Sequence, residues 1–287
     1  MSWWYWIPVL SVFCLARLWR ASDTPVMSDV LRTSERWRLP MTAVAHADAV
    51  RRTRRIAVGE TLGAAVGVLL GGVGLALAGG APDYPYPILF GFVLGMTFGS
   101  TLGAAGADPA PPADARVAHA RDVSVDDLQP RWLTALVWLV PAGAVVATGV
   151  VTAIRPDPWQ APGSGVAAVV AAFATVAGLG LFAIVRHRAL RTPRTARTDL
   201  ELAWQDGFVA RSVTLASTAV LVPALALLAI AIVPDAADGG LPFAVVMLIA
   251  LGPILLARPQ RTFRRRLWDD RSFHLTSEDL YPALRGT

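Results

Sequence analysis

The chain has 287 residues, of which 54% are hydrophobic and 16% are charged, and its net charge is +5. This composition, with a mean hydropathy of +0.50, excludes an ordinary soluble domain and is typical of an integral membrane protein. All 26 basic residues are arginine. The chain therefore lacks the lysine that a Walker A loop, a kinase-type ATP site or a Schiff-base enzyme requires.

A short apolar segment, residues 3–16, comes first and begins with a cluster of aromatic side chains. The nearest arginines, Arg17 and Arg20, follow this segment, whereas a cleavable signal peptide carries its basic residues before the apolar stretch. We therefore expect an N-terminal anchor helix whose aromatic residues lie at the outer membrane interface. Because the segment is short for a full span, a re-entrant or interfacial helix followed by six spans is the alternative.

Six longer apolar segments follow, and each has about the length that a helix needs to cross the bilayer. Backbone amides must be paired in lipid, and these continuous apolar runs do not alternate as barrel strands do. The predicted fold is therefore an all-α polytopic membrane bundle of about seven transmembrane helices, an anchor helix followed by three helical hairpins. The six segments cover residues 56–79, 86–105, 132–154, 165–185, 212–233 and 241–257.

The arginines predict the orientation of the bundle. All of them except Arg155 lie in four segments, on the same side of every predicted hairpin, and the positive-inside rule places that side in the cytoplasm. Seven crossings then put the N-terminus outside and the C-terminus inside, in the plasma membrane. The predicted parts are an anchor helix (1–20), a cytoplasmic segment (21–55), a first hairpin (56–106), a cytoplasmic linker (107–131), a second hairpin (132–185), a cytoplasmic loop (186–211), a third hairpin (212–257) and a cytoplasmic tail (258–287).

Glycines recur every four residues along both helices of the first hairpin. Residues four apart share one face of a helix, and a face without side chains lets two backbones approach closely. The pattern predicts a glycine zipper in which the two helices pack against each other, with a homo-oligomer contact as the alternative. The glycines are Gly59, Gly63, Gly67 and Gly71 on the first helix and Gly91, Gly95, Gly99 and Gly103 on the second.

Glu60 is the only acidic residue inside the six longer apolar segments. An ionisable group within the membrane is a candidate functional site, here for an ion or a proton. Glu60 lies about one turn beyond a run of cytoplasmic arginines, so its carboxylate can also reach the interface or pair with an arginine. The sequence favours this structural role and keeps the ion or proton site as the alternative.

Two clusters in the cytoplasmic segments combine tryptophan with carboxylates, namely Trp204 with Asp206, and Trp268 with Asp269 and Asp270. Their position favours interfacial tryptophans with carboxylates paired to neighbouring arginines. The alternative is a docking surface for a cytoplasmic partner. The four histidines and the single cysteine lie far apart, so no metal, cofactor or catalytic site is predicted.

These observations favour a non-catalytic membrane protein, a subunit or scaffold with an arginine-rich cytoplasmic face. We expect that face to attract anionic lipids, and a protein partner or a homo-oligomer is compatible with it, whereas nothing indicates nucleic-acid binding. The alternative is a small permease or channel-like transporter that uses Glu60, and it predicts a polar path through the bundle. A membrane enzyme ranks third, because the carboxylates that it would need occur mainly in the cytoplasmic segments.

Overall fold

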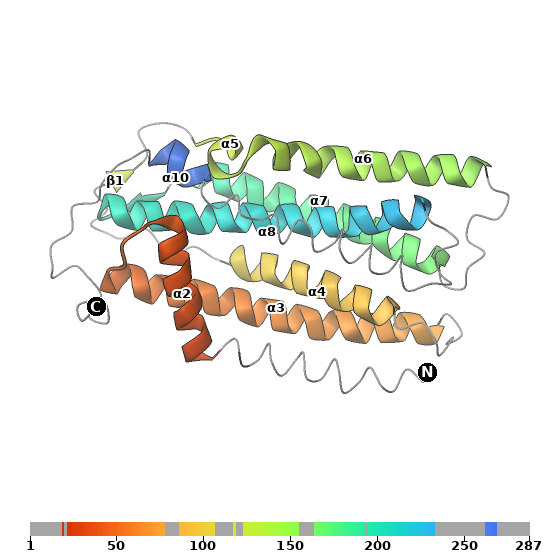
Figure 1. The fold of residues 1–287 in the computed structure, drawn as a ribbon, viewed down its shortest axis with the longest axis horizontal. Helices are drawn as coiled ribbons and strands as arrows, with labels where there is room; N and C mark the ends of the chain where they lie inside the picture. Colours follow the sequence, from red (N-terminus) through yellow and green to blue (C-terminus); the bar gives the residue numbers. More distant parts are fainter. Residues whose placement is uncertain are drawn as a thin grey trace.

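The computed structural model describes residues 19, 22–77, 86–106, 117–118, 123–154, 164–192, 194–232 and 262–268. Within these ranges the chain is a bundle of long helices packed side by side (Figure 1). The elements in chain order are α2 (Asp23–Trp37), α3 (Ala43–Leu77), α4 (Tyr86–Ala104), β1 (Val117–Ala118), α5 (Val125–Leu128), α6 (Arg131–Ile154), α7 (Ser164–Arg191), β2 (Thr195–Ala196), α8 (Asp199–Ile232) and α10 (Thr262–Leu267).

Four of these helices, α3, α6, α7 and α8, are long and apolar enough to cross a membrane. The apolar part of α4, Phe90–Ala104, is shorter than the apolar parts of these four helices. The helical class is thus confirmed for the described residues, with β1 and β2 as a short antiparallel pair between two connecting segments. The predicted helices over residues 3–16 and 241–257 lie outside the described residues, so the count of seven stays a prediction.

Two of these four helices begin well before their apolar segments. Helix α3 starts at Ala43 and α8 at Asp199, whereas the apolar segments begin at residues 56 and 212. Residues 43–55 include four alanines and four arginines, both of which favour helix, and residues 199–211 mix charged with apolar side chains. Both helices therefore continue out of the apolar zone and carry polar side chains with them.

Helix α2 is an element that the apolar pattern did not predict. It is amphipathic and buries Val26, Val30 and Trp37 against the bundle. Arg38 ends it in the left-handed conformation, with φ of 53°, and the N–H of Leu39 then donates to the carbonyl of Ser34 at 3.1 Å. The helix lies across one end of the bundle (Figure 1).

Helix α8 forms the centre of the bundle, and most of its span is buried. Small and branched side chains fill the space between it and helices α4, α6 and α7, including Val213, Ala216 and Ala219, which have no exposed surface. The outer faces of α3, α6 and α7 instead expose large apolar side chains such as Leu69, Val145 and Phe173. Apolar surface of this extent is characteristic of a lipid-facing side.

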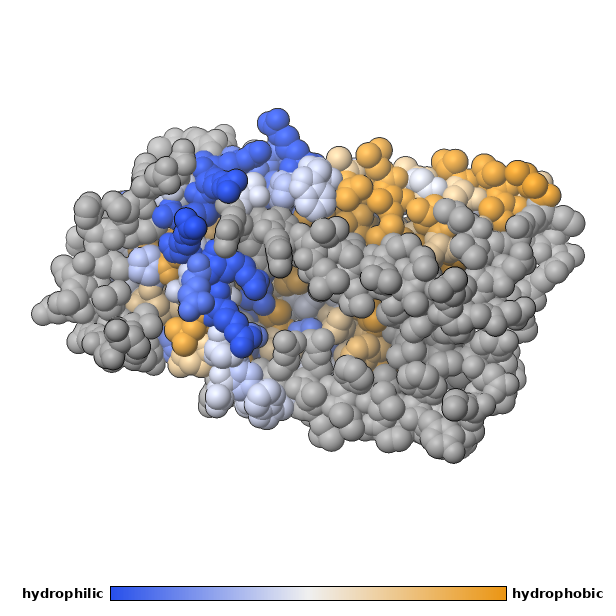
Figure 2. All heavy atoms as spheres, in the orientation of Figure 1, coloured by the Kyte–Doolittle hydropathy of each residue, from blue (hydrophilic) through white to orange (hydrophobic). Residues whose placement is uncertain are grey.

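The polar residues gather at one end of the bundle, which we call the basic end (Figure 2). Helices α2 and α10 lie at this end (Figure 1). The arginines of α10 and many of those of the long helices belong to this end. These include Arg51, Arg52, Arg54 and Arg55 of α3, Arg131 of α6, Arg186, Arg188 and Arg191 of α7, and Arg264, Arg265 and Arg266 of α10.

Helices α3 and α4 approach each other through their glycines. A Cβ atom built on Gly63 would overlap the carbonyl oxygen of Gly95 and lie 2.8 Å from the Cα of Gly99. Equivalent overlaps occur between Gly59 and Gly99 and between Gly67 and Gly91. Since the obstructing atoms belong to the backbone, a side chain at these positions would require the two helices to move apart.

Candidate functional site

Four aromatic side chains pack together at the basic end, and we call them the aromatic cluster: Trp37, Trp204, Phe208 and Phe263. The ring centroid of Trp37 lies 5.5 Å from Trp204, 5.3 Å from Phe208 and 5.5 Å from Phe263, in tilted and edge-to-face arrangements. The missing side chain of Gly207 makes room for Trp37, because a Cβ there would come within 2.5 Å of its ring. The cluster joins α2, α8 and α10.

A buried ion pair lies beside the aromatic cluster. The Asp206 carboxylate accepts a hydrogen bond from Arg194 Nη1 at 2.9 Å and another from the indole N–H of Trp268 at 2.8 Å. Arg194 Nη2 donates in addition to the carbonyl of Ala189 at 2.9 Å. The side chain of Asp206 is 0% exposed and that of Arg194 is 8% exposed, so the two charges neutralise each other out of water.

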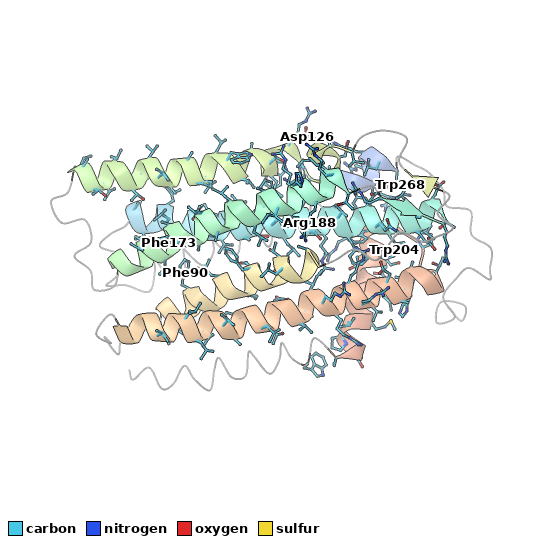
Figure 3. All side chains as sticks on the ribbon, turned by 180° about the vertical axis from the view of Figure 1, so that it is seen from behind. Phe90, Asp126, Phe173, Arg188, Trp204 and Trp268 are labelled. Carbon is cyan, nitrogen blue, oxygen red and sulfur yellow. The ribbon has the colours of Figure 1, made fainter. Side chains whose placement is uncertain are left out.

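This ion pair connects segments that are far apart in the sequence. Asp206 belongs to α8, Arg194 to the segment before β2, and Trp268 directly follows α10. The indole of Trp204 donates to the carbonyl of Pro40 at 3.0 Å and ties α8 to the segment after α2. Figure 3 shows Trp204 and Trp268 at the basic end, whereas Phe173 lies further along the bundle.

A second, exposed ion pair lies at the start of α6. Arg131 Nε donates to the Asp126 carboxylate at 2.7 Å, with side-chain exposures of 77% and 36%. Arg266 Nη1 donates to the backbone carbonyl of Asp126 at 2.7 Å, which links α10 to α5. The two ion pairs therefore share the same chemistry but differ in burial.

A cavity of about 70 Å³ opens at the basic end between α3, α4 and α8. The Asp48 carboxylate on its wall accepts hydrogen bonds from Arg52 at 2.8 Å and from Arg51 at 3.1 Å. The guanidinium of Arg52 also lies 5.3 Å from the ring centroid of Phe208, in a cation–π contact. The lining residues are Asp48, Arg51, Arg52, Arg55, Ile56, Gly103, Ala104, Gly106, Phe208 and Ser212.

The carboxyl end of α4 forms one side of this cavity. Ser212 Oγ donates to the carbonyl of Ala104 at 3.1 Å, and Arg188 Nη1 donates to the carbonyl of Ala105 at 3.3 Å. The last backbone carbonyls of a helix have no partner within the helix and carry partial negative charge, so they accept hydrogen bonds from these two donors. They hold α4 against α7 and α8.

The predicted site residues divide into three groups. Trp204, Asp206 and Trp268 are buried in the basic end, and Asp206 is paired with Arg194. Glu60 is half-buried on α3 and does not line the cavity. Asp269 and Asp270 lie outside the described residues.

Three parts of the site escaped the sequence analysis: the side chain of Trp37, the choice of Arg194 as partner of Asp206, and the arginine-lined cavity. Each depends on contacts between segments distant in the sequence, although the run of four arginines at residues 51–55 was a signal that could have indicated the cavity. Among the described residues, no group of three or more His, Cys, Asp or Glu side chains is placed to hold a metal ion.

Comparison with known protein families, with curated proteins and with solved structures finds no match. The site offers fixed guanidinium groups and aromatic rings, which suit the binding of anions and the joining of helices.

Proposed function

We propose that this protein is a non-catalytic, multi-pass subunit or scaffold of the plasma membrane, with the basic end in the cytoplasm. The observation that carries the proposal is the buried Asp206–Arg194–Trp268 arrangement, which joins three segments at the basic end, while the Trp204–Pro40 hydrogen bond adds a fourth. A fixed layer of this kind suits a platform that holds other molecules. Its exposed arginines would attract anionic lipid headgroups by about 1 kcal/mol each near the membrane surface.

The interior of the bundle supports a scaffold more than a transport path. Thr214 and Thr218 of α8 each donate to a backbone carbonyl one turn earlier, at 2.9 Å. Ser217 donates to Val213 and to the buried side chain of Gln129, both at 3.0 Å. These hydroxyl groups are engaged within the protein, and the space around α8 is filled by apolar side chains.

The close α3–α4 contact adds to this picture. Backbones held together through glycine faces form a rigid pair, and we propose that the glycine zipper serves this packing within one chain. A stiff hairpin would hold the residues of α3 at the basic end in constant positions relative to α4.

The alternative is a small permease or channel-like transporter with Glu60 as its ion or proton site. The position of Glu60 favours it, because this carboxylate is half-buried on a helix that is long and apolar enough to cross the membrane. On this alternative, Glu60→Gln would abolish flux while leaving the protein folded.

Purification of the full chain in mild detergent, with mass spectrometry of the proteins and lipids that accompany it, tests the two functions. The scaffold predicts a stoichiometric protein partner and enrichment of anionic over zwitterionic lipids, and both should persist in Glu60→Gln. A partner-free homo-oligomer whose ion flux in reconstituted vesicles is lost in Glu60→Gln would overturn the scaffold in favour of the transporter.

A further inference from the structure

The cavity between α3, α4 and α8 has a chemistry that the scaffold function alone does not require. We infer that it is a binding site for one phosphate group, carried by the headgroup of an anionic lipid. The inference rests on the proposed function, because it assigns one defined site within the basic end that is proposed to attract such lipids.

The charges on the cavity wall favour an anion. Arg51, Arg52 and Arg55 line it together with a single carboxylate, that of Asp48, which leaves an excess of positive charge. Guanidinium groups present paired N–H donors that match the oxygens of a phosphate. Basic pockets between membrane helices on the cytoplasmic side are a recurrent form of lipid-headgroup site.

One of these arginines is held in place before any ligand arrives. The side chain of Arg52 is 14% exposed, bonds to Asp48 at 2.8 Å and lies over the ring of Phe208. Arg51 bonds to the same carboxylate at 3.1 Å, but its side chain is 57% exposed, so a bound group can reach it from solvent. A donor that is fixed before the ligand arrives lowers the entropy cost of binding.

The size of the cavity suits a phosphate group. Its volume is about 70 Å³, whereas one water needs only about 10–15 Å³ of such space. The hydroxyl of Ser212 and the backbone around Gly103 and Gly106 complete the wall. Because the Ser212 hydroxyl already donates to the Ala104 carbonyl, the donors available to a phosphate are the arginines of α3.

The position of the cavity indicates a lipid as the source of the phosphate. Ile56 closes the cavity on the side of the apolar zone, and the next turns of α3 expose Val58, Leu62 and Val66. A headgroup in the cavity would place its acyl chains along this apolar face. A soluble phosphate would use the arginines but would gain nothing from that face.

Native mass spectrometry of the full chain from mild detergent tests the site with dioctanoyl phosphatidylglycerol, dioctanoyl phosphatidylcholine and inorganic phosphate as probes. The site variant is Arg51→Gln with Arg55→Gln. The matched control is Arg186→Gln with Arg265→Gln, which removes the same charge from exposed arginines of the basic end that do not line the cavity. Gly106→Trp keeps every charge and obstructs the cavity, and its Cβ has room, since the nearest atom is 3.4 Å away.

We expect the wild type to bind one phosphatidylglycerol tightly and to prefer it to phosphatidylcholine. The site variant and Gly106→Trp should each weaken this binding at least about tenfold more than the control variant does, because a defined site depends on position as well as on charge. If the double glutamine site variant fails to fold, Gly106→Trp carries the comparison.

Other outcomes overturn the inference in distinguishable ways. Equal weakening of phosphatidylglycerol binding by the site and control variants would show that the cavity is not a defined site. The general attraction of the basic end for anionic lipids would still stand. If inorganic phosphate saturates the site in a manner that depends on its arginines, and the two lipids bind equally, the ligand is a soluble phosphate and not a lipid. A wild type that binds neither anionic probe would overturn both the site and the proposed attraction of anionic lipids.

Discussion

Asp206 and Asp126 each pair with an arginine, at 2.9 Å and 2.7 Å, but in opposite surroundings. Asp206 is shielded from water by the aromatic cluster and by Trp268, whereas Arg131, the partner of Asp126, is mostly exposed. An exposed pair is screened by water and contributes little to stability. Removing one member of a buried pair leaves the other charge buried and uncompensated.

We predict that Asp206→Asn lowers the free energy of unfolding by about 3–5 kcal/mol, because Arg194 then lacks its counter-charge. Asp126→Asn is the matched control and should cost no more than about 1 kcal/mol. Unfolding of the full chain by SDS, followed through tryptophan fluorescence, measures both. Similar losses in the two variants would show that the Asp206 pair contributes no more than a surface pair.

The sequence predicted the kind of partner for Asp206 but could not select it. Carboxylates among many arginines are expected to pair, yet Arg194, Arg197 and Arg211 all lie within reach along the chain. The choice of Arg194 follows from how the segment before β2 folds back on α8, and the bond from Trp268 spans 62 residues. Such contacts arise from tertiary packing, which local sequence patterns do not contain.

At the scale of the element, the glycines of α3 differ in what surrounds them. A Cβ on Gly63 would meet backbone atoms of α4, whereas a Cβ on Gly74, on the same helix, would meet nothing within 4 Å. We predict that Gly63→Ala lowers the free energy of unfolding by about 1–3 kcal/mol, because the added methyl group forces the two backbones apart.

Gly74→Ala is the control for this prediction, and its expected effect has the opposite sign. Alanine favours helix over glycine by about 1 kcal/mol, and nothing opposes the added methyl group at this position. The same SDS titration gives both values. A Gly63→Ala chain as stable as the Gly74→Ala chain would mean that the glycine contact does not hold α3 and α4 together.

The apolar pattern predicted both ends of α4 and α6 within one residue but only the apolar parts of α3 and α8. Runs of apolar residues predict the part of a helix that lies in lipid, and for α3 and α8 they predicted only that part. Their first turns were missed because residues 43–55 and 199–211 are charged, and hydropathy does not separate a polar helix from a polar loop. Helix α2 was also missed because it is largely polar. Only a few of its residues are buried, and they do not form a continuous apolar run.

At the scale of the whole molecule, the bundle is asymmetric along its length. The described arginines lie mainly at the basic end, and the sides of α3, α6 and α7 expose apolar residues. In a membrane, this asymmetry would set one preferred orientation, because arginine-rich segments are retained in the cytoplasm. The connection after α6, residues 155–163, contains one arginine and one aspartate and would face outward.

We predict that a thiol at the basic end is protected from outside reagents in intact cells, and that one in the connection after α6 is not. In a Cys14→Ser background, which removes the single native cysteine, Asp157→Cys should react with a membrane-impermeant maleimide at once. Arg265→Cys, exposed on α10, should react only after the membrane is permeabilised. The Cys14→Ser chain itself measures background labelling, and permeabilised cells show that both thiols are reactive. Labelling of Arg265→Cys in intact cells, with Asp157→Cys protected, would show that the bundle has the opposite orientation. The phosphate site and the scaffold surface would then lie at the outer face, where the positive-inside rule does not place them.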